Sequence, residues 1–263
     1  MTMSKRRNQD HDEESFFISM TDIMIGLLFI FIIIVVYFAQ QIDAKIKSTD
    51  DYVATTKRQK TLILNNIKNE LRGQGISNVE VDQKQGILRL PEGVLFKSGK
   101  FIIKANTKPY EVTIKIANAF HKVLKCSVLQ KNNDKLEPQK DNCFLWNKEG
   151  AFVDSIFIEG HTDPDAYRGG NFLLAAKRST QTYDLMMKSE TRLKKFFSPE
   201  GKQIFAVSAF GETRPIKPND TEENKRANRR IDIRVLMYVP QTSSALKQFK
   251  KRLCNEFEYT KYC

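Results

Sequence analysis

The chain has 263 residues, of which 41% are hydrophobic, and carries a formal net charge of +12 at pH 7. This length suits one globular domain together with a membrane segment. The positive charge is spread along the chain without a nucleic-acid-binding motif, so anionic headgroups, a carboxylate-rich polymer or no partner at all fit better than nucleic acid. No nucleophile–base pair, phosphate-binding loop or metal constellation stands out, and we expect neither an enzyme nor a bound metal or cofactor.

The most apolar segment, residues 16–39, lies near the start of the chain. At about 1.5 Å per residue it forms a helix of roughly 36 Å, enough to cross a bilayer once. The basic residues Lys5, Arg6 and Arg7 before it also suit a signal peptide, but the apolar run is longer than usual for one and no convincing cleavage site follows. We therefore predict a tail over residues 1–15 and an uncleaved transmembrane helix over residues 16–39.

Asp22 is the only charged residue of this segment. A carboxylate inside the hydrocarbon costs free energy, and acidic residues in such positions commonly mark ion pathways, so Asp22 is our candidate ion carrier. Thr21 beside it offers an oxygen that could support a sodium ion, although a proton is the favoured ion. Alternatively, Asp22 reaches headgroup water near the helix start and only caps the helix.

Residues 40–75 contain no proline, and glycine enters only at Gly73 and Gly75. Apolar residues recur with the spacing of a broken heptad, which predicts a helical stalk that pairs weakly with a second copy of itself and ends at the glycines. A solvated linker helix is the alternative. The apolar positions are Ile42, Ile46, Val53, Ile63 and Ile67.

Residues 76–240 have the pattern of an α/β domain of the α+β type. Strand-like and helix-like segments predict a β-α-β-α-β-β sandwich with helices on one face of a small mixed sheet. We expect an irregular insertion loop over residues 125–150 and a C-terminal tail over residues 241–263. The predicted strands are residues 79–82, 86–90, 155–159, 205–209 and 231–237, and the predicted helices are residues 109–124 and 171–187.

Four cysteines occur without a Cys-x-x-Cys pair, which disfavours zinc-ribbon and thioredoxin-like sites. Their even number and wide spacing suit disulfides in an oxidising compartment, and sequence proximity favours Cys126 with Cys143 and Cys254 with Cys263. Free buried thiols are the alternative. Because basic residues lie on both sides of the apolar segment, the cysteines decide the orientation better than charge does, and they favour a periplasmic C-terminal domain.

Four motifs follow one another along the second half of the chain. They are IEGHTD at residues 158–163, LAAKRS at residues 174–179, AFGETRP at residues 209–215 and NRRIDI at residues 228–233. In this order they resemble an OmpA-like peptidoglycan-binding domain over about residues 79–240. His161 in the first motif is expected to be a structural hydrogen-bonding residue, because no second histidine or carboxylate has metal-ligand spacing around it.

The resemblance implies that Asp163 and Arg178 bind the diaminopimelate of the peptidoglycan stem peptide. This amino acid presents an ammonium and a carboxylate on one centre, so its site needs one anionic and one planar cationic side chain. Considered singly, Asp163 would be a helix cap and Arg178 a surface ion-pair residue. The residues implied as supports are Thr162, Asn171 and Arg230.

The tail, the acid-bearing helix, the stalk and the OmpA-like domain together resemble the MotB family of peptidoglycan-anchored stator subunits. Asp22 falls where that family places its ion-carrying aspartate. The resemblance implies a homodimer inside a ring, pentameric in this interpretation, of MotA-like (ZorA-type) membrane subunits, driven by H+ rather than Na+ and without a cofactor. It also implies a single-pass inner-membrane protein with a cytoplasmic N-terminus and a periplasmic C-terminal domain.

Within that family, the isoleucine-rich run after Asp22 looks more like the ZorB subunits of the Zorya anti-phage defence system than like flagellar subunits. Flagellar helices usually carry methionine and bulky aromatic residues there. A flagellar stator subunit is nevertheless an alternative. A second alternative is a passive cell-wall tether with a plain membrane anchor, for which the substitution Asp22→Asn would be silent.

Overall fold

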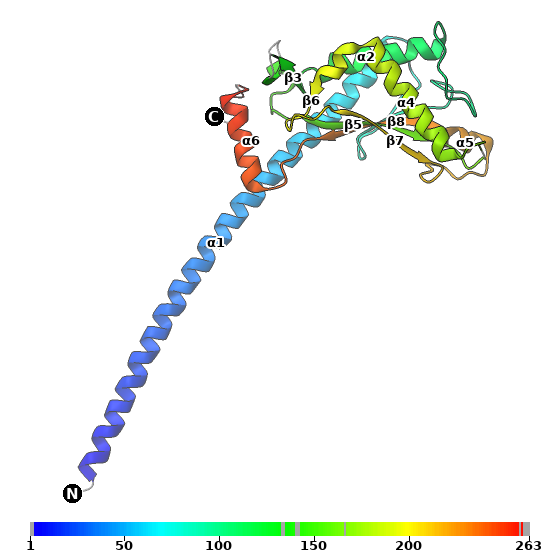
Figure 1. Ribbon diagram of the computed structural model, residues 1–263. Helices are drawn as coiled ribbons and strands as arrows, with labels where there is room; N and C mark the ends of the chain where they lie inside the picture. The colour runs from blue at the N-terminus through cyan, green and yellow to red at the C-terminus, as the bar shows by residue number, and fades with distance from the viewer. Residues whose placement is uncertain (1–2, 133–134, 140–142, 166, 258, 260–263) are drawn as a thin grey trace. The chain divides into compact units, whose positions relative to one another are not determined.

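The computed structural model describes residues 3–132, 135–139, 143–165, 167–257 and 259 (Figure 1). The chain divides into two compact units, residues 1–51 and residues 52–263. Helix α1 (Met3–Gly73) contributes to both units. Each unit is described separately below.

In the first unit, α1 contains a stretch long and apolar enough to span a membrane, Met20–Asp43. It begins four residues later than the predicted span of residues 16–39. The side chains from Met20 to Asp43 are exposed to solvent within this unit, as expected of a surface that faces lipid or partner helices. Asp22 and Thr21 lie in the first turn of the stretch.

The second unit begins inside the predicted stalk. The helix expected over residues 40–75 is present and ends at Gly73, but from Tyr52 onward it is packed into the globular unit. Ile63 and Ile67, assigned above to a seam between two copies, are buried in the core of their own chain. The prediction of a free stalk up to residue 75 is therefore wrong for residues 52–73. At Ile63 and Ile67 the apolar spacing reflects burial against this domain, whereas Ile42, Ile46 and Val53 are exposed.

The centre of the second unit is a five-stranded mixed sheet of order β1-β2-β8-β5-β7. All neighbouring strands are antiparallel except β5 and β7, which are parallel. The predicted strands are all present with shifted ends, and the sheet and its helices form the α+β arrangement that the sequence predicted. The strands are β1 (Glu80–Asp82), β2 (Ile87–Pro91), β5 (Val153–His161), β7 (Phe205–Gly211) and β8 (Arg230–Met237).

Helices α2 (Lys108–Leu124) and α4 (Asn171–Ser189) lie side by side over one face of this sheet (Figure 1). Alternate residues of the strands, such as Ile158 and Ile233, point into the core that these helices close. Their neighbours Glu159 and Asp232 point to the other face. Two short helical elements complete this region, η1 (Thr191–Lys195) and α5 (Glu222–Asn228).

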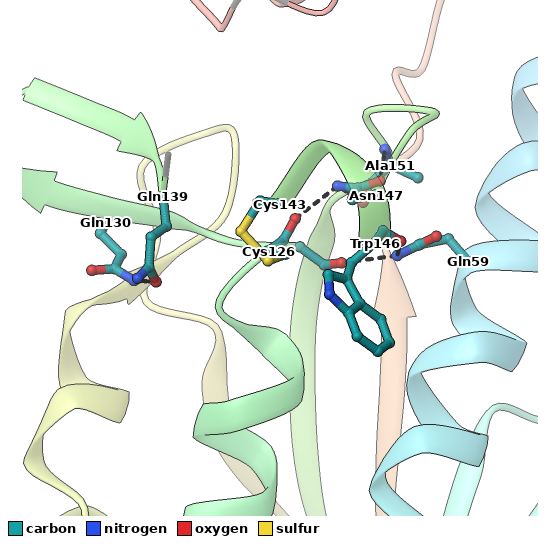
Figure 2. The surroundings of a disulfide bond; sticks show 9 residues. Gln59, Cys126, Gln130, Gln139, Cys143, Trp146, Asn147 and Ala151 are labelled. Atoms are coloured by element: carbon teal, nitrogen blue, oxygen red, sulfur yellow. Dashed lines mark hydrogen bonds between the residues drawn. A yellow bond between two sulfur atoms is a disulfide. The ribbon is translucent and has the colours of Figure 1, made fainter. Parts of the chain in front are cut away.

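Residues 125–150 are not the irregular loop that was predicted. They contain β3 (Leu129–Asn132), β4 (Lys135–Pro138) and the single-turn helix α3 (Cys143–Trp146). With β6 (Phe196–Phe197), the first two form a second sheet of order β4-β3-β6. A disulfide joins Cys126 to Cys143 at the base of this insertion (Figure 2). Strand pairing with a distant segment, rather than local polarity, determines its structure.

The C-terminal segment is also ordered into the domain. Helix α6 (Ser243–Asn255) buries Leu246, Phe249 and Leu253 against Phe152 and Tyr52. Phe257 and Tyr259 are buried in the same cluster, so the described part of the predicted tail of residues 241–263 belongs to the fold. Its apolar residues follow helical spacing among many lysines, a pattern typical of an amphipathic helix. The predicted Cys254–Cys263 pairing involves a residue outside the described part of the chain.

Candidate functional site

Asp163 and Arg178 are brought near each other by the packing of β5 against α4. Gly160 of β5 lies directly beneath Ala175 of α4, and a Cβ built on this glycine would lie 2.2 Å from the Ala175 carbonyl oxygen. Only glycine permits this approach. Asp163 follows Gly160 by three residues, and Arg178 lies about one helical turn after Ala175, so this contact fixes the separation of the two side chains.

Asp163 is buried, with 6% of its surface exposed. Its carboxylate accepts a hydrogen bond from Nη1 of Arg229, and its backbone oxygen accepts one from Nδ2 of Asn171 at 3.1 Å. The backbone N–H of Thr162 donates to the Gly211 oxygen at 2.9 Å, which ties the loop after β5 to the end of β7. The anionic side chain is thus held in a rigid, desolvated position.

Arg178 is likewise buried and is held by the loop between β2 and α2. Its Nε donates to the Lys100 oxygen at 2.9 Å and its Nη2 to the Lys97 oxygen at 3.0 Å. The Phe96 ring centroid lies 5.6 Å from its Cζ. Burial lowers the pKa of Arg178, and the carboxylates of Glu92 and Asp163 oppose that shift. Asp163 and Arg178 therefore interact through charge, without a hydrogen bond between them in the described residues.

Arg229, which the sequence analysis did not select, is the central cation of the site. It forms salt bridges with Asp163, with Glu92 at 2.7 Å and with Glu222. Burial alone would lower the pKa of Arg229, but the hydrogen bonds to the three carboxylates raise it overall. The consecutive arginines of the NRRIDI motif indicated that one of them would point toward the site, but not which one.

Arg230, the predicted support, has other partners. Its guanidinium donates to Asp232 at 3.0 Å and to the backbone oxygens of Asn228 and Arg214. Arg230 lines a small cavity together with Arg178, but among the described residues it makes no hydrogen bond or salt bridge to Asp163. Successive residues around the start of β8 point in different directions, so Arg229 rather than Arg230 pairs with Asp163.

Four side chains around Asp163 have buried polar atoms without a hydrogen-bond partner in the described residues. They are Oγ1 of Thr162, Oδ1 of Asn171, Oε1 of Glu92 and Nε of Arg229. Buried polar atoms are rarely left unsatisfied, and such a cluster indicates a place for a polar ligand or ordered water. The adjacent cavity, lined by Glu92, Arg178 and Arg229, has a volume of only about 10 Å³. It accommodates at most a water molecule in this conformation.

A second polar cluster surrounds His161 on the sheet face opposite the apolar core. Its Nε2 lies 3.6 Å from Oδ2 of Asp232 and 4.0 Å from Oε2 of Glu159, a proximity that sequence spacing did not reveal. Contrary to the prediction, neither ring nitrogen of His161 has a hydrogen-bond partner among the described residues. The ring instead stacks on Phe210 with centroids 5.3 Å apart.

The three side chains around His161 include ligand types that metals accept, and their candidate atoms lie within 4.8 Å of one another. However, arginines already pair with both carboxylates: Arg234 with Glu159 at 2.7 Å, and Arg89 and Arg230 with Asp232. Burial, followed by the charges of Arg230, Arg214, Arg89 and Arg234, lowers the pKa of His161 to about 3. This positive surrounding opposes a metal cation, and the cluster is better explained as a buried ion network.

Asp163, Arg178 and Arg229 lie in a segment that matches a known protein family. Residues 147–229 match the OmpA family. Over 236 residues the chain is 24% identical to Zorya protein ZorB of Escherichia coli O139:H28 (strain E24377A / ETEC), covering 89% of this chain and 85% of that protein. The chain thus contains a segment that matches the OmpA family and is similar to ZorB over most of its length.

Two solved structures with TM-scores of about 0.4 also match part of the chain. The periplasmic domain of Helicobacter pylori MotB (residues 78–256) is 23% identical, with 65% of this chain and 85% of that chain covered and a TM-score of 0.41. A putative MotB-like protein from Desulfovibrio vulgaris is 19% identical, with 71% and 99% of the two chains covered and a TM-score of 0.42.

Proposed function

We propose that this MotB-like protein is the peptidoglycan-anchored B subunit of an ion-driven stator complex in the bacterial inner membrane. The observation that carries the anchoring function is the buried pair Asp163 and Arg178, surrounded by unsatisfied polar atoms at the end of β5, inside the OmpA-matching segment. A buried acid and a buried guanidinium held apart by a rigid frame suit a ligand that carries both charges on one centre.

Diaminopimelate of the stem peptide is such a ligand. In our proposal its ammonium takes the place of Arg229 at Asp163, and its carboxylate takes the place of the Lys97 and Lys100 carbonyls at Arg178. Arg229 keeps Glu92 and Glu222 as partners when it releases Asp163. Because the present cavity is smaller than this ligand, the loop that carries Lys97 and Lys100 moves outward on binding.

Asp22 supplies the ion-carrying function in this proposal. The neutral carboxyl faces an apolar ring of MotA-like subunits, while the anion needs a polar contact, so binding and release of a proton change which contact is favoured. We propose a homodimer within a pentameric ring, H+ as the ion, a cytoplasmic N-terminus and a periplasmic globular unit. Within the described residues, Met20–Asp43 is the one stretch long and apolar enough to span a membrane, which supports a single-pass anchor.

We assign the complex to Zorya-type anti-phage defence, because the ZorB protein aligns over most of both chains. A flagellar stator subunit is the second candidate, which the likeness to MotB domains keeps open. The test is Asp22→Asn in the native host, scored for phage resistance and for swimming, with Asp43→Asn as the matched control at the other end of the apolar stretch. Loss of phage resistance with intact swimming supports defence, loss of swimming supports the flagellar role, and loss of neither contradicts both.

The anchoring function has its own test. The full chain in detergent is mixed with purified peptidoglycan sacculi and sedimented, and its binding to a free diaminopimelate-containing tripeptide is measured by calorimetry. Asp163→Asn and Arg178→Ala are expected to abolish both. Asp165→Asn, at an exposed carboxylate nearby that pairs with Lys225, is the matched control. Wild-type binding by Asp163→Asn and Arg178→Ala would refute the assignment.

A further inference from the structure

A second concave surface lies apart from the Asp163 site. A groove of about 720 Å³ lies between the last turns of α1 and the end of α2, and Trp146 of α3 is among its lining residues. Its volume is in the range of small-ligand pockets. It shares no lining residue with the small cavity beside Arg178. The groove is lined by Asn66, Asn69, Glu70, Gly73, Gln74, Lys122, Val123, Lys125, Cys126 and Trp146.

Trp146 is an exposed aromatic residue whose backbone is held by hydrogen bonds and a nearby disulfide. Its surface is 64% exposed, and Figure 2 shows the indole projecting away from Asn147. The backbone beneath it is fixed: the Trp146 oxygen accepts a hydrogen bond from Gln59, and the next residue, Asn147, is fully buried and bonds to the backbone of Cys126 and Ala151. The Cys126–Cys143 disulfide closes the same turn. An exposed aromatic ring on a fixed backbone loses little conformational entropy when a ligand binds, and such rings are common in binding sites.

Several polar side chains of the groove beside the indole are held in place by hydrogen bonds. Oε2 of Glu70 accepts a hydrogen bond from Lys122 at 2.8 Å, and Oε1 accepts one from Gln74 at 3.2 Å. The hydrogen bond from Lys122 is the main cause of the lowered pKa of Glu70. The amides of Asn66 and Asn69 line the same groove. An aromatic ring beside amides and a carboxylate suits the binding of a sugar. The C–H face of a sugar ring stacks on the aromatic ring, and its hydroxyl and acetamido groups pair with hydrogen-bond donors and acceptors.

We propose that this groove binds the amino-sugar backbone of peptidoglycan, with one N-acetylated ring stacked on Trp146. The acetamido and hydroxyl groups bond to Asn66, Asn69 and Glu70. Lys122 and Lys125 also line the groove, and their ammonium groups can donate hydrogen bonds to the hydroxyl, acetamido and lactyl-amide oxygens of the strand. The inference rests on the proposed cell-wall function and extends it from the stem peptide to the glycan strand. Two modest sites on one polymer strengthen attachment without either being tight.

Trp146 is the only tryptophan of the chain, so its fluorescence reports on this groove alone. The full-length protein in detergent is titrated with tetra-N-acetylchitotetraose, a glycan without stem peptide, while emission is followed. We expect a saturable blue shift. By calorimetry, Trp146→Ala and Asn69→Ala are expected to weaken binding of the same sugar about tenfold or more, while Ile102→Ala, at another exposed apolar residue, leaves it within about twofold.

The stem-peptide and glycan sites are separated by crossing the probes. Trp146→Ala is expected to bind the diaminopimelate-containing tripeptide like the wild type, which also shows that it is folded, while Asp163→Asn binds the sugar normally and loses the tripeptide. If the tripeptide fails to bind the wild type, the stem-peptide assignment falls and sugar binding is judged separately. No saturable sugar response, or unchanged sugar affinity in Trp146→Ala, overturns the glycan proposal. The proposal is also overturned if Trp146 emission of the sugar-free protein is already blue-shifted and changes when the protein is diluted. That result would mean that a second copy of the chain covers the groove.

Discussion

Gly160 of β5 lies against the backbone of Ala175 in α4, with no room for a Cβ on the glycine. Because Asp163 and Arg178 lie on either side of this contact, it sets the geometry of the site as well as the packing of the core. A methyl group added here would meet backbone, which cannot rotate away as a side chain can.

The first prediction is that Gly160→Ala lowers both stability and ligand binding. The added methyl group forces α4 away from β5, at a cost of about 1–3 kcal/mol in the free energy of unfolding. Binding of the tripeptide is expected to fall in parallel, because Arg178 moves with the helix. Denaturant titration and calorimetry on the full chain measure the two effects. Gly73→Ala, where a Cβ meets nothing within 4 Å, should leave both unchanged, and equal behaviour of the two variants would refute the role of this contact.

A second prediction concerns Arg229. Arg229→Gln leaves the buried carboxylates of Asp163 and Glu92 without their cation, which is expected to cost about 3–5 kcal/mol of unfolding free energy. Arg226→Gln, an arginine of the same segment that pairs with Glu222 at the exposed surface, should cost less than about 1 kcal/mol. Chemical denaturation of the two variants side by side measures the difference, and similar losses would contradict a central position for Arg229.

The sequence was sufficient to predict the sheet, α2 and α4, because apolar residues with period two or 3.6 are created by burial on one face. It failed where a segment pairs with a distant partner. The insertion at residues 125–150 is polar and looked irregular, yet β3 pairs with β6 from residues 196–197. The end of α1 was predicted to be a stalk. A helix that buries one face against its own domain has the same spacing of apolar residues as a helix that buries it against a second copy.

The candidate site was predicted in outline only. Asp163, Thr162 and Asn171 lie together at the end of β5, and Arg178 lies close enough for its pKa to respond to Asp163. Arg229 was missed and Arg230 chosen in its place, because a run of two arginines at a helix-to-strand transition does not tell which side chain turns inward. Glu92 was missed since its distance of 71 residues from Asp163 along the chain carries no local pattern.

A third prediction tests the Cys126–Cys143 disulfide. Replacing both cysteines by serine opens a loop with a sequence separation of 17, which in the loop-entropy treatment costs about 3 kcal/mol of stability. The wild type under oxidising conditions is the reference for denaturant titration. The double variant should also show broader, red-shifted Trp146 emission, because the turn that carries the indole loses its covalent closure. An unchanged unfolding midpoint would mean that the closed loop contributes nothing to the fold.

The fourth prediction concerns acid. His161 is 1% exposed, and its pKa falls from 6.5 to about 3 because burial and the surrounding arginines disfavour the imidazolium. Below pH 6.5 the unfolded chain therefore takes up a proton that the folded chain does not, and stability falls as pH decreases toward 3. Between pH 7 and pH 5 this single group is expected to remove about 2 kcal/mol from the free energy of unfolding.

His161→Gln removes that proton uptake, so its unfolding free energy should fall less than that of the wild type over the same pH range, whatever its stability at pH 7. Urea titrations at pH 7, 6 and 5 on both proteins measure the difference. The other groups near the ring, Glu159, Asp232 and four arginines, are present in both proteins and largely cancel in the comparison. Parallel pH profiles would show that His161 takes up a proton in the folded state, and that the arginine-rich cluster does not exclude the imidazolium as the structure indicates.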